Sequence, residues 1–536
     1  MATLNFKGKV FVQNYHLSVK YHQLVPKKDK SLTDKVSLND NLIIHGDNLK
    51  VLKALLPTYA GKVKCIYIDP PYNTGNENWV YNDNVNSPMM QEWLGKIVDK
   101  EDLTRHDKWL CMMMPRLKLL RELLSEDGAI CISIDDIELA KLINIMDEIF
   151  GENNKEEIIC WRRRHNQPND KSKAISKVAE FIVVYVKDID YLKKTKAFYG
   201  LALTGDFSNP DNDPKGDWAS KPWKAGSNQT GTKYKIITPK GKALEEEWLG
   251  TEETYQKYLK ERRIYFPKKG NGFPRKKYYK FEREEEGQCA HNFWDHKEFG
   301  SNQEASEELK TLGIEFDNPK PTRLIKALLE IFTNKNSITL DSFAGSGPTA
   351  HAALDLDKED SGKRKFILVE CEDYADKITA ERVRRVIKGV KTAKDEKLKK
   401  GLGSTFSYFE LGDAIEMENI LEGNKLPSYE ELARYVFYTA TGEEFEPKKI
   451  KEKSNFIGES REYEVYLYYK PDIEYLKATA FDLNKAKALG PYKGKKRLIF
   501  APSKYLDLND SELVERHGLK GIEYCQLPFE IYKLKE

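Results

Sequence analysis

Long apolar runs and paired cysteines are both scarce in this sequence of 536 residues. No stretch approaches the ~18 consecutive apolar residues of a membrane-spanning helix, and the lysine-interrupted start lacks the apolar core of a signal peptide. The seven cysteines are odd in number and include no C-x-x-C pair, which is typical of reduced thiols. These features argue against a membrane protein and a disulfide-stapled secreted domain, and they predict a cytoplasmic location.

Charge of one sign, nucleotide loops and metal-ligand spacings are also missing. The net charge is only +3, so any nucleic-acid surface must be a local patch. No G-x-x-x-x-G-K-[ST] loop is present, so we expect no ATPase. Cys289, His291, Asp295 and His296 fit no zinc spacing, and we assign no metal site. With 40% hydrophobic and 32% charged residues, the chain is typical of a globular protein of several domains.

Strands and helices alternate in the two outer parts of the region 41–390. Predicted strands 42–47, 63–68, 128–134, 337–340 and 365–369 alternate with predicted helices 48–59, 107–125, 136–150, 322–332 and 373–387. This alternation predicts a doubly wound α/β sheet, mostly parallel, with helices on its faces.

A stiff acidic loop follows the apolar run 63–68 and consists of Asp69, Pro70, Pro71 and Tyr72. Because proline cannot continue a ladder, the loop lies at the strand's carboxyl end, where such sheets bind ligands. The amino nitrogen of a nucleobase is a poor nucleophile, since its lone pair is delocalised into the ring. The Asp69 carboxylate and the Pro70 carbonyl can accept its N–H bonds, and the Tyr72 ring can stack on a flipped base. The loop therefore favours base methylation, although ordinary strand-to-turn junctions share its composition.

A second loop, after the predicted strand 337–340, suits a nucleotide-like cofactor. It contains Asp341, Phe343, Gly345 and Gly347, and the glycines allow a ligand to approach the backbone closely. Glu370 follows the next predicted strand and lies 23 residues after Gly347. This is near the spacing of about 20 residues at which an acid bonds the ribose in dinucleotide-binding motifs. This segment alone would also fit NAD. Its combination with Asp-Pro-Pro-Tyr favours a methyl donor instead.

Between these two loops, aromatic residues and cations are interleaved. The candidate DNA contacts are Arg162, Arg163, Arg164, Lys221, Trp223, Lys224, Arg275, Lys276 and Lys277. Cations suit phosphates, and rings and amides suit bases. The alternative is a β-rich insert whose aromatic residues form its own small core.

The first loop continues as Asn73-Thr74-Gly75 and resembles the catalytic motif of amino-group DNA methyltransferases, in their adenine-N6 branch. The order of the two loops resembles the circularly permuted β group of this family. The stretches 217–226, 263–266 and 432–442 are similar to modification (Mod) subunits of type III restriction-modification systems.

This resemblance implies S-adenosylmethionine as methyl donor and a Rossmann-like methyltransferase fold. By resemblance, Phe343, Gly345 and Gly347 line the donor, and Asp341 belongs to the same set. Glu370 would hold its ribose and Asp47 its adenine, although Asp47 also suits a helix N-cap. Lys320, Pro321 and Thr322 are similar to the segment around its methionine end.

The resemblance also implies a domain order. We expect an N-terminal arm (1–40), a catalytic half (41–155), a target-recognition insert (156–315), a cofactor half (316–390), a linker (391–405) and a C-terminal α/β domain (406–536). The implied partners are double-stranded DNA, a second copy of the chain and a separate restriction subunit with ATPase and nuclease, which the C-terminal domain could contact.

Three rival functions stay open at this point. Methylation of cytosine N4 would use the same acceptors, although an Asp at position 69 favours adenine within the family. A second rival is a DNA-binding specificity subunit whose methyltransferase site has decayed. The motif residues are intact, which argues against this rival; they are Asp69, Tyr72, Gly345, Gly347 and Glu370. Methylation of RNA is disfavoured by the size of the insert.

Overall fold

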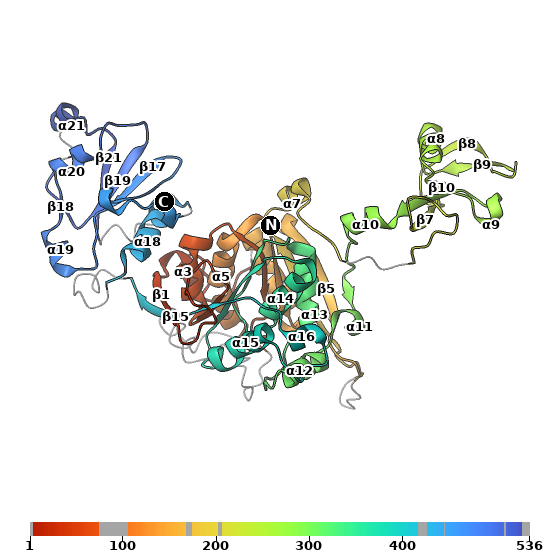
Figure 1. Ribbon diagram of the computed structural model, residues 1–536, viewed down its shortest axis with the longest axis horizontal. Coiled ribbons are helices and arrows are strands. Elements are labelled where there is room, and N and C mark those ends of the chain that lie inside the picture. Colours follow the sequence, from red (N-terminus) through yellow and green to blue (C-terminus); the bar gives the residue numbers. More distant parts are fainter. Residues whose placement is uncertain are drawn as a thin grey trace. The chain divides into compact units, whose positions relative to one another are not determined.

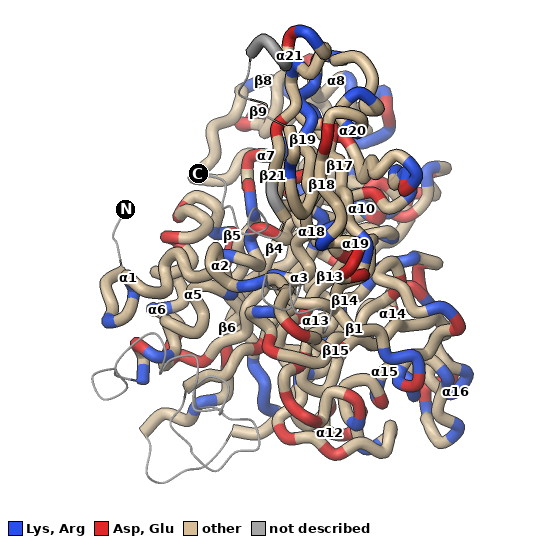
Figure 2. The backbone as a smooth tube through the Cα atoms, turned by 90° about the vertical axis from the view of Figure 1, so that its left-hand side faces the viewer, with Lys and Arg blue, Asp and Glu red and all other residues tan. Residues whose placement is uncertain are grey.

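The structure is a computed structural model that describes residues 4–73, 105–167, 174–201, 206–415, 426–443, 445–506, 508 and 511–527. The chain divides into two compact units (Figure 1). The first unit comprises Met1–Ala197 and Asn292–Glu536, and the second comprises Phe198–His291. Basic and acidic residues are interspersed along most of the chain (Figure 2), so the small net charge reflects mixing of the two signs.

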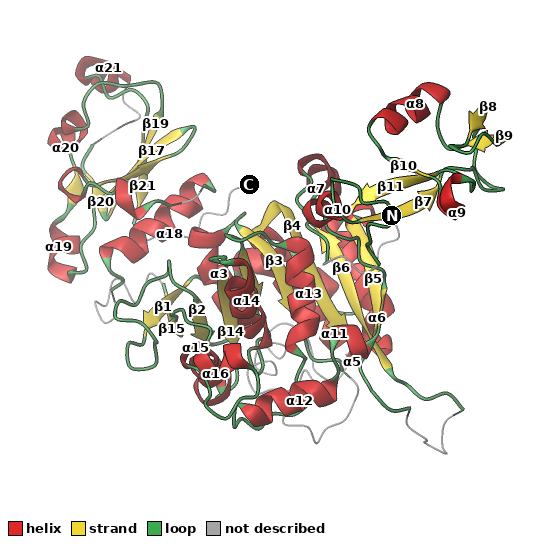
Figure 3. Ribbon diagram, turned by 45° about the vertical axis from the view of Figure 1, so that its right-hand side comes forward, coloured by secondary structure: helices red, strands yellow, loops and turns green. Residues whose placement is uncertain are grey.

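The first unit is built on a ten-stranded sheet (Figure 3). In spatial order its strands are β1 (His22–Pro26), β15 (Ser407–Ala414), β2 (Leu42–His45), β14 (Lys365–Glu370), β13 (Ile338–Asp341), β3 (Val63–Ile68), β4 (Leu124–Ile134), β6 (Ala179–Val186), β5 (Lys155–Arg162) and β12 (Phe293–Trp294). Neighbours from β15 to β4 are parallel, whereas β6 is antiparallel to both of its neighbours. The predicted α/β class with a mostly parallel sheet is therefore confirmed.

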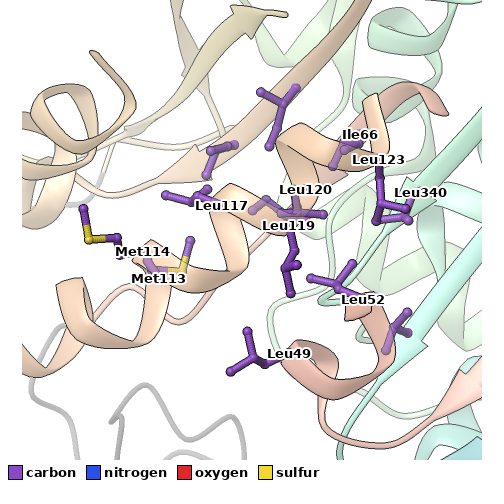
Figure 4. Packing of buried hydrophobic residues seen from close by; sticks show 14 of the residues in the cluster. Leu49, Leu52, Ile66, Met113, Met114, Leu117, Leu119, Leu120, Leu123 and Leu340 are labelled. Carbon is purple, nitrogen blue, oxygen red and sulfur yellow. The ribbon is translucent and has the colours of Figure 1, made fainter. Parts of the chain in front are cut away.

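Helices cover both faces of this sheet. Along β2, Leu42 and Ile44 belong to one hydrophobic cluster and Ile43 to another, because successive side chains of a strand point to opposite faces. The first cluster includes α3 (Asn48–Tyr59), α5 (Arg105–Leu123) and α6 (Asp136–Phe150). The second includes α12 (Asn302–Thr311), α14 (Pro348–Asp360) and α15 (Glu381–Lys388). Figure 4 shows leucines of α3 and α5 beside Ile66 and Leu340 of the sheet.

The chain reverses its direction of winding between β13 and β3. From β13 the chain passes through α14 to β14, which is the neighbour of β13 toward the β1 edge of the sheet. From β3 it passes through α5 to β4, which is the neighbour of β3 toward the β12 edge. The two strands are parallel neighbours, so their carboxyl ends meet at a topological switch point. In open α/β sheets this is where ligands bind.

Several contacts differ from the predicted domain boundaries. Within the expected N-terminal arm, β1 pairs with β15, and α1 (Lys9–Val12) and α2 (Tyr15–Ser18) pack on α5. The strands β5, β6 and β12 lie inside the expected insert, yet they extend the large sheet. Likewise β15, at the start of the expected C-terminal domain, pairs with β2. Strand β15 pairs with β1 and β2 from the distant start of the chain, which local sequence does not reveal.

The remaining helices of this part complete the layers around the sheet. They are α7 (Ile189–Thr195), α11 (His296–Phe299), α13 (Thr322–Phe332), the π-helix η2 (Ala375–Ala380) and α16 (Glu396–Lys400). Helix α13 packs on α14 and contacts β3, so the segment just before it reaches the switch point.

Beyond β15 the chain forms a smaller sheet in the order β16 (Phe456–Glu459), β17 (Tyr463–Leu467), β19 (Lys496–Ala501) and β21 (Ile522–Gln526). Its helices are α18 (Tyr429–Thr441), α19 (Ile473–Ala478), α20 (Leu483–Ala488) and α21 (Ser511–His517), with a short strand pair of β18 (Ala480–Phe481) and β20 (Ser503–Lys504). Helix α18 packs on α3, and Arg434 Nη1 donates to Thr58 Oγ1 at 2.9 Å.

The second unit has a small core of its own. An antiparallel sheet contains β10 (Ile264–Tyr265), β11 (Arg275–Tyr279) and β7 (Trp218–Pro222), and a hairpin contains β8 (Thr232–Ile237) and β9 (Ala243–Trp248). The helical elements are α8 (Glu252–Lys260), α9 (Pro267–Gly270) and α10 (Lys280–Glu286). Trp223, Trp248 and Tyr255 are buried together in its core. In the described ranges of both units, no helix has the length and apolar character needed to cross a membrane.

Candidate active site

A cavity of about 310 Å³ lies at the carboxyl ends of β3 and β13. Its wall includes Asp69, Pro70, Pro71 and Tyr72 from the loop after β3. The end of β13 contributes Asp341, and the loop after it contributes the residues from Phe343 to Ser346. The two loops that sequence analysis selected therefore meet at one site, although 272 positions separate Asp69 from Asp341.

Asp69, Tyr72 and Lys320 form a closed triangle of hydrogen bonds inside this cavity. Lys320 Nζ donates to Asp69 Oδ2 at 2.6 Å and to the Tyr72 hydroxyl at 2.8 Å. The Tyr72 hydroxyl donates to Asp69 Oδ1 at 2.7 Å. The ammonium also lies 5.0 Å from the centre of the Tyr72 ring. Both oxygens of the predicted acceptor carboxylate are thus engaged by side chains of this chain.

Glu180 supplies a second carboxylate, which sequence reasoning did not select. It stands near the start of β6 and is only 2% exposed. Its Oε2 lies 3.2 Å from the Tyr72 hydroxyl and 3.6 Å from Lys320 Nζ. Its Oε1 pairs with Arg163 Nη1 at 2.8 Å. A single acid in an otherwise apolar strand is the one signal that could have identified it.

Burial and charge act against each other in this cluster. Burial raises the pKa of the Asp69 carboxyl above its ordinary value, and the Lys320 ammonium opposes that rise. Burial alone would lower the pKa of Lys320, but Asp69 and Glu180 outweigh burial and hold it above its ordinary value. Lys320 is therefore a cation at neutral pH. Burial also raises the pKa of the Tyr72 hydroxyl, so Tyr72 remains a neutral donor.

Neighbouring side chains hold the acidic loop in place. Trp109 Nε1 donates to the Pro71 carbonyl at 2.7 Å. Asn73 has a left-handed φ of 58°, and its side chain donates to Glu138 Oε1 at 2.6 Å and to the Arg105 carbonyl at 3.1 Å. Asn tolerates such a φ better than most residues. The loop is therefore positioned by buried hydrogen bonds on its far side, which leaves its other side to the cavity.

The loop after β13 presents backbone to the cavity and turns sharply into α14. Gly345 and Gly347 have left-handed φ values of 52° and 79°, which favour glycine. Gly347 caps α14, and a Cβ there would lie 3.3 Å from the Thr379 carbonyl oxygen. Of the residues expected to bind a cofactor, those that line the cavity are Lys320, Asp341, Phe343 and Gly345.

Two carboxyls of this region titrate far from their ordinary range. Glu370 accepts backbone N–H bonds from Gly345 at 2.7 Å, Cys371 at 2.8 Å and Glu372 at 3.1 Å. Burial nevertheless raises the pKa of Glu370 to about 7. Burial also raises the pKa of Asp341 to about 7, although the Thr349 hydroxyl and the Phe343 N–H donate to its carboxylate. Both groups therefore change charge near neutral pH.

The other expected cofactor residues have structural roles. Asp47 caps α3 by accepting the Lys50 N–H at 3.2 Å, as its alternative role predicted. Pro321 stands at the N-cap of α13. The Thr322 hydroxyl donates to Glu308 at 2.8 Å and accepts from the buried Arg382 at 3.0 Å. None of these three is among the side chains that line the cavity described above.

The candidate DNA contacts fall into two groups. Lys277 and Trp223 are buried in the second unit, at 2% and 4% exposure, and their polar atoms are paired within it. Their placement corrects the expectation that they are surface contacts, because both stabilise the unit's interior. Lys221 and Lys224 are exposed, while Arg275 and Lys276 are half-buried beside Ser220 and Tyr258.

The three consecutive arginines at the end of β5, Arg162, Arg163 and Arg164, also differ from one another. Arg163 pairs with Glu180 at the cavity, as described, and Arg164 lines the same cavity. Arg162 Nη1 lies 3.6 Å from Asp295 Oδ2. Within the described residues, no group of three or more His, Cys, Asp or Glu side chains is arranged to hold a metal ion.

Comparisons with known proteins identify similar chains. Residues 63–381 match a family model described as DNA methylase. The Mod subunit of the type III restriction-modification enzyme StyLTI from Salmonella typhimurium is 35% identical over 68% of this chain and 57% of its own length. The EcoPI Mod subunit of Escherichia phage P1 is 31% identical over 78% of this chain and 73% of its own. The chain therefore spans little more than half of the Salmonella relative.

A type II methyltransferase and a solved structure are also similar. M.KpnI of Klebsiella pneumoniae is 30% identical over 64% of this chain and 82% of its own length. The solved PvuII DNA methyltransferase, described as cytosine-N4-specific, is 13% identical with a TM-score of 0.33, covering 64% of this chain and 86% of that one.

Proposed function

Because this chain belongs to the DNA methylase family, we propose that it transfers a methyl group from S-adenosylmethionine to a base amino group in double-stranded DNA. The observation that carries this proposal is the meeting of Asp69 and Tyr72 with the loop of Gly345 in one cavity. That cavity lies at the switch point of a doubly wound sheet. A base pocket and a donor pocket must be adjacent for a methyl group to pass between them.

Asp69 is the residue that we expect to activate the amine. We expect its carboxylate to accept one N–H bond of the amino group and the Pro70 carbonyl to accept the other. Both acceptors draw the lone pair away from the ring and onto nitrogen, which makes the nitrogen a better nucleophile. As the nitrogen–methyl bond forms, the sulfur–methyl bond of the donor would break, and its electron pair would remain on sulfur in the departing thioether. The surplus proton on nitrogen would then pass to the Asp69 carboxylate and on to solvent. Positioning of the two reactants supplies most of the acceleration.

The side chains around the cavity fit a positively charged methyl donor. Carboxyl groups outnumber cations in its wall: the former are Asp69, Asp135, Glu180, Asp317 and Asp341, and the latter are Arg163, Arg164 and Lys320. S-adenosylmethionine supplies a methyl group activated by a positive sulfur. Phe343 and Gly345, which line the cavity, are our candidates to contact the donor, together with Gly347. As the resemblance implies, Glu370 would hold its ribose and Asp47 its adenine.

Adenine N6 is the target amine that we propose, with cytosine N4 as the alternative. The acceptor pair Asp69 and Pro70 would serve either amine. The support for adenine is the Asp that opens the motif, together with the similarity to Mod subunits.

We further propose that the chain modifies DNA within a type III restriction-modification system. The similarity to Mod subunits of such systems supports this role. A separate subunit would then provide the ATPase and the nuclease, and two copies of this chain would form the modification core. The small sheet that follows β15 is our candidate surface for that subunit.

Methyl transfer to DNA is the direct test. Purified protein is incubated with labelled S-adenosylmethionine and unmethylated genomic DNA, alongside Asp69→Asn, and the digested nucleosides are identified. We expect N6-methyladenine from the wild type and a loss of at least about 100-fold in the variant. N4-methylcytosine would select the alternative base. Binding of donor and DNA without transfer would instead identify a specificity subunit.

A further inference from the structure

Lys320 occupies the position that the target amine needs. Its Nζ lies 2.6 Å from Asp69 Oδ2 and 2.8 Å from the Tyr72 hydroxyl. The side chain is only 7% exposed, so solvent screens this contact weakly. An ammonium and an exocyclic amine are both N–H donors of similar size. One carboxylate oxygen therefore binds, in the free protein, a donor that resembles the group it would activate during methyl transfer.

Lys320 has a second carboxylate within reach. Glu180 Oε2 lies 3.6 Å from its Nζ, just beyond hydrogen-bond distance. Glu180 is held from the other side by Arg163 at 2.8 Å, and it is almost fully buried. A small rotation of the lysine side chain would exchange Asp69 for Glu180. The cation would then stay paired, which a buried charge requires.

From this geometry we propose that Lys320 is a positioning residue, which holds the place of the target amine on Asp69 and moves to Glu180 when the amine arrives. The proposal rests on the proposed methyl transfer. It assigns Lys320 a role different from the donor contact that the resemblance implies. In the free protein the Lys320 ammonium opposes the rise that burial causes in the pKa of Asp69, and its departure frees one carboxylate oxygen to accept an N–H bond.

Asp69 has several ionisable neighbours, and each must be considered in a pH experiment. They are Tyr67 on β3, Tyr72 on the same loop, Arg163 after β5, Glu180 on β6, Lys320 before α13 and Asp341 on β13. Arg164 also lines the cavity, and of the three cations in its wall, Lys320 is the one that donates directly to Asp69. Removal of Lys320 leaves Asp69 beside acids and neutral phenols, with Arg163 retained by Glu180.

The first measurement is the pH profile of kcat/KM for methyl transfer to genomic DNA, because this ratio reports ionisations of the free enzyme. In Lys320→Met we expect the acid limb to move to higher pH by about 1 to 3 units, as for a carboxylate that loses a close cation. The matched control is Lys326→Met, which removes a lysine of α13 that is paired with Asp355 and Glu359 at 2.7 Å. An unchanged limb in Lys320→Met would overturn the proposal, because a lysine that only contacts the donor would alter the donor KM instead.

The role of Glu180 is tested by combining variants. We expect Glu180→Gln to raise the KM for DNA in the wild-type background, because Lys320 then lacks its second partner. In the Lys320→Met background the same change has a smaller effect, since no cation has to move. An equal effect in both backgrounds would show that Glu180 acts independently of Lys320, and the exchange would be rejected.

A third measurement separates failure of this inference from failure of the proposed function. Thermal unfolding of the free protein is compared for Asp69→Asn, Lys320→Met and the double variant. Paired residues give a double variant that is less destabilised than the two single changes together. Strict additivity would overturn the pairing whether or not the protein methylates DNA. A wild type that transfers no methyl group, but shows coupling, would reject only the reaction.

Discussion

Glu370 Oε2 accepts a hydrogen bond from the backbone N–H of Gly345 at 2.7 Å. This contact links the end of β14 to the loop that follows β13, 25 positions earlier in the chain. The other carboxylate oxygen accepts the N–H groups of Cys371 and Glu372. Glu370 thus holds the backbone of the loop after β13 in place at the cavity.

The first prediction concerns the pH dependence of stability at Glu370. Its folded-state pKa of about 7 lies above the ordinary value, so its contribution to stability is fully present below about pH 4 and is lost as the pH rises to about 7. Glu370→Gln removes this ionisation. We therefore expect the free energy of unfolding of the variant, relative to that of the wild type, to increase as the pH rises from 5 to 8, by on the order of 3 kcal/mol.

Urea denaturation at a series of pH values measures this difference. The exposed Glu396, at the start of α16, provides the control variant Glu396→Gln, for which we expect a difference that is independent of pH. A flat difference for Glu370→Gln as well would show that its carboxyl ionises normally.

The second prediction concerns the backbone of the loop after β13, which we expect to contact the methyl donor. Gly347→Ala introduces a Cβ at φ 79° and 3.3 Å from the Thr379 carbonyl oxygen. Gly61→Ala introduces one at φ 69° with no atom within 4 Å, and is the control for backbone strain alone. We expect both to lose about 1 kcal/mol of stability. Only Gly347→Ala should also weaken binding of S-adenosylmethionine, measured by calorimetry. Equal donor affinity in both variants would contradict a role for this turn in donor binding.

The acidic loop could be predicted because its signals are local. The apolar run from Val63 to Ile68 ends at the predicted position, and two prolines forbid its continuation. The pair formed by Asp69 and Lys320 could not be predicted, since 251 positions separate the two residues. Their contact depends on how α13 packs against β3, which no local pattern encodes.

Surface and core roles were harder to distinguish in the sequence. Lys277 stands in a run of cations that suits a phosphate surface, yet β-strand alternation turns it inward, where it pairs with Asp213 at 2.6 Å. Thr322 lies two positions after the cavity residue Lys320, yet the start of α13 directs its hydroxyl to Glu308 and Arg382. In both cases the direction of the side chain depends on the element that carries it.

The third prediction concerns the buried hydrogen-bond network of Arg382, which reaches Ser346 in the loop after β13. Arg382 is fully buried and donates to Ser346 Oγ at 2.9 Å and Thr322 Oγ1 at 3.0 Å, with Glu308 at 3.4 Å. Arg382→Met leaves the Glu308 carboxyl without its cation, so we expect a loss of about 3 to 5 kcal/mol in urea denaturation. The surface pair of Lys397 and Glu359 is the control, for which Lys397→Met should cost under about 1 kcal/mol. Similar losses of stability in the two variants would mean that the buried contacts of Arg382 contribute no more than a surface ion pair.

The fourth prediction compares two lysines of the second unit. Lys277 is buried between Asp211 and Asp213, with Nζ–Oδ distances of 2.5 and 2.6 Å. Lys277→Met therefore leaves a buried carboxylate unpaired, and we expect the unit to lose about 3 to 5 kcal/mol of stability, seen as faster hydrogen exchange within β7 and β11. Lys221 is exposed, so Lys221→Ala should leave exchange in those strands unchanged. Unaltered exchange in Lys277→Met would contradict its structural role.

The last prediction concerns the affinity for DNA, which we expect to depend on the exposed Lys221 even though the stability of the unit does not. If Lys221 contacts a phosphate, Lys221→Ala weakens binding of duplex DNA uniformly across sequences and reduces the slope of log affinity against log salt by about 1, because one fewer counterion is released. Fluorescence anisotropy of a labelled duplex at several salt concentrations measures both quantities. Lys233, which is exposed and lies 3.7 Å from Glu247, provides a second cation of the same unit for comparison. A slope that is unchanged in both variants would remove these lysines from the DNA-binding surface and direct attention to the half-buried Arg275 and Lys276.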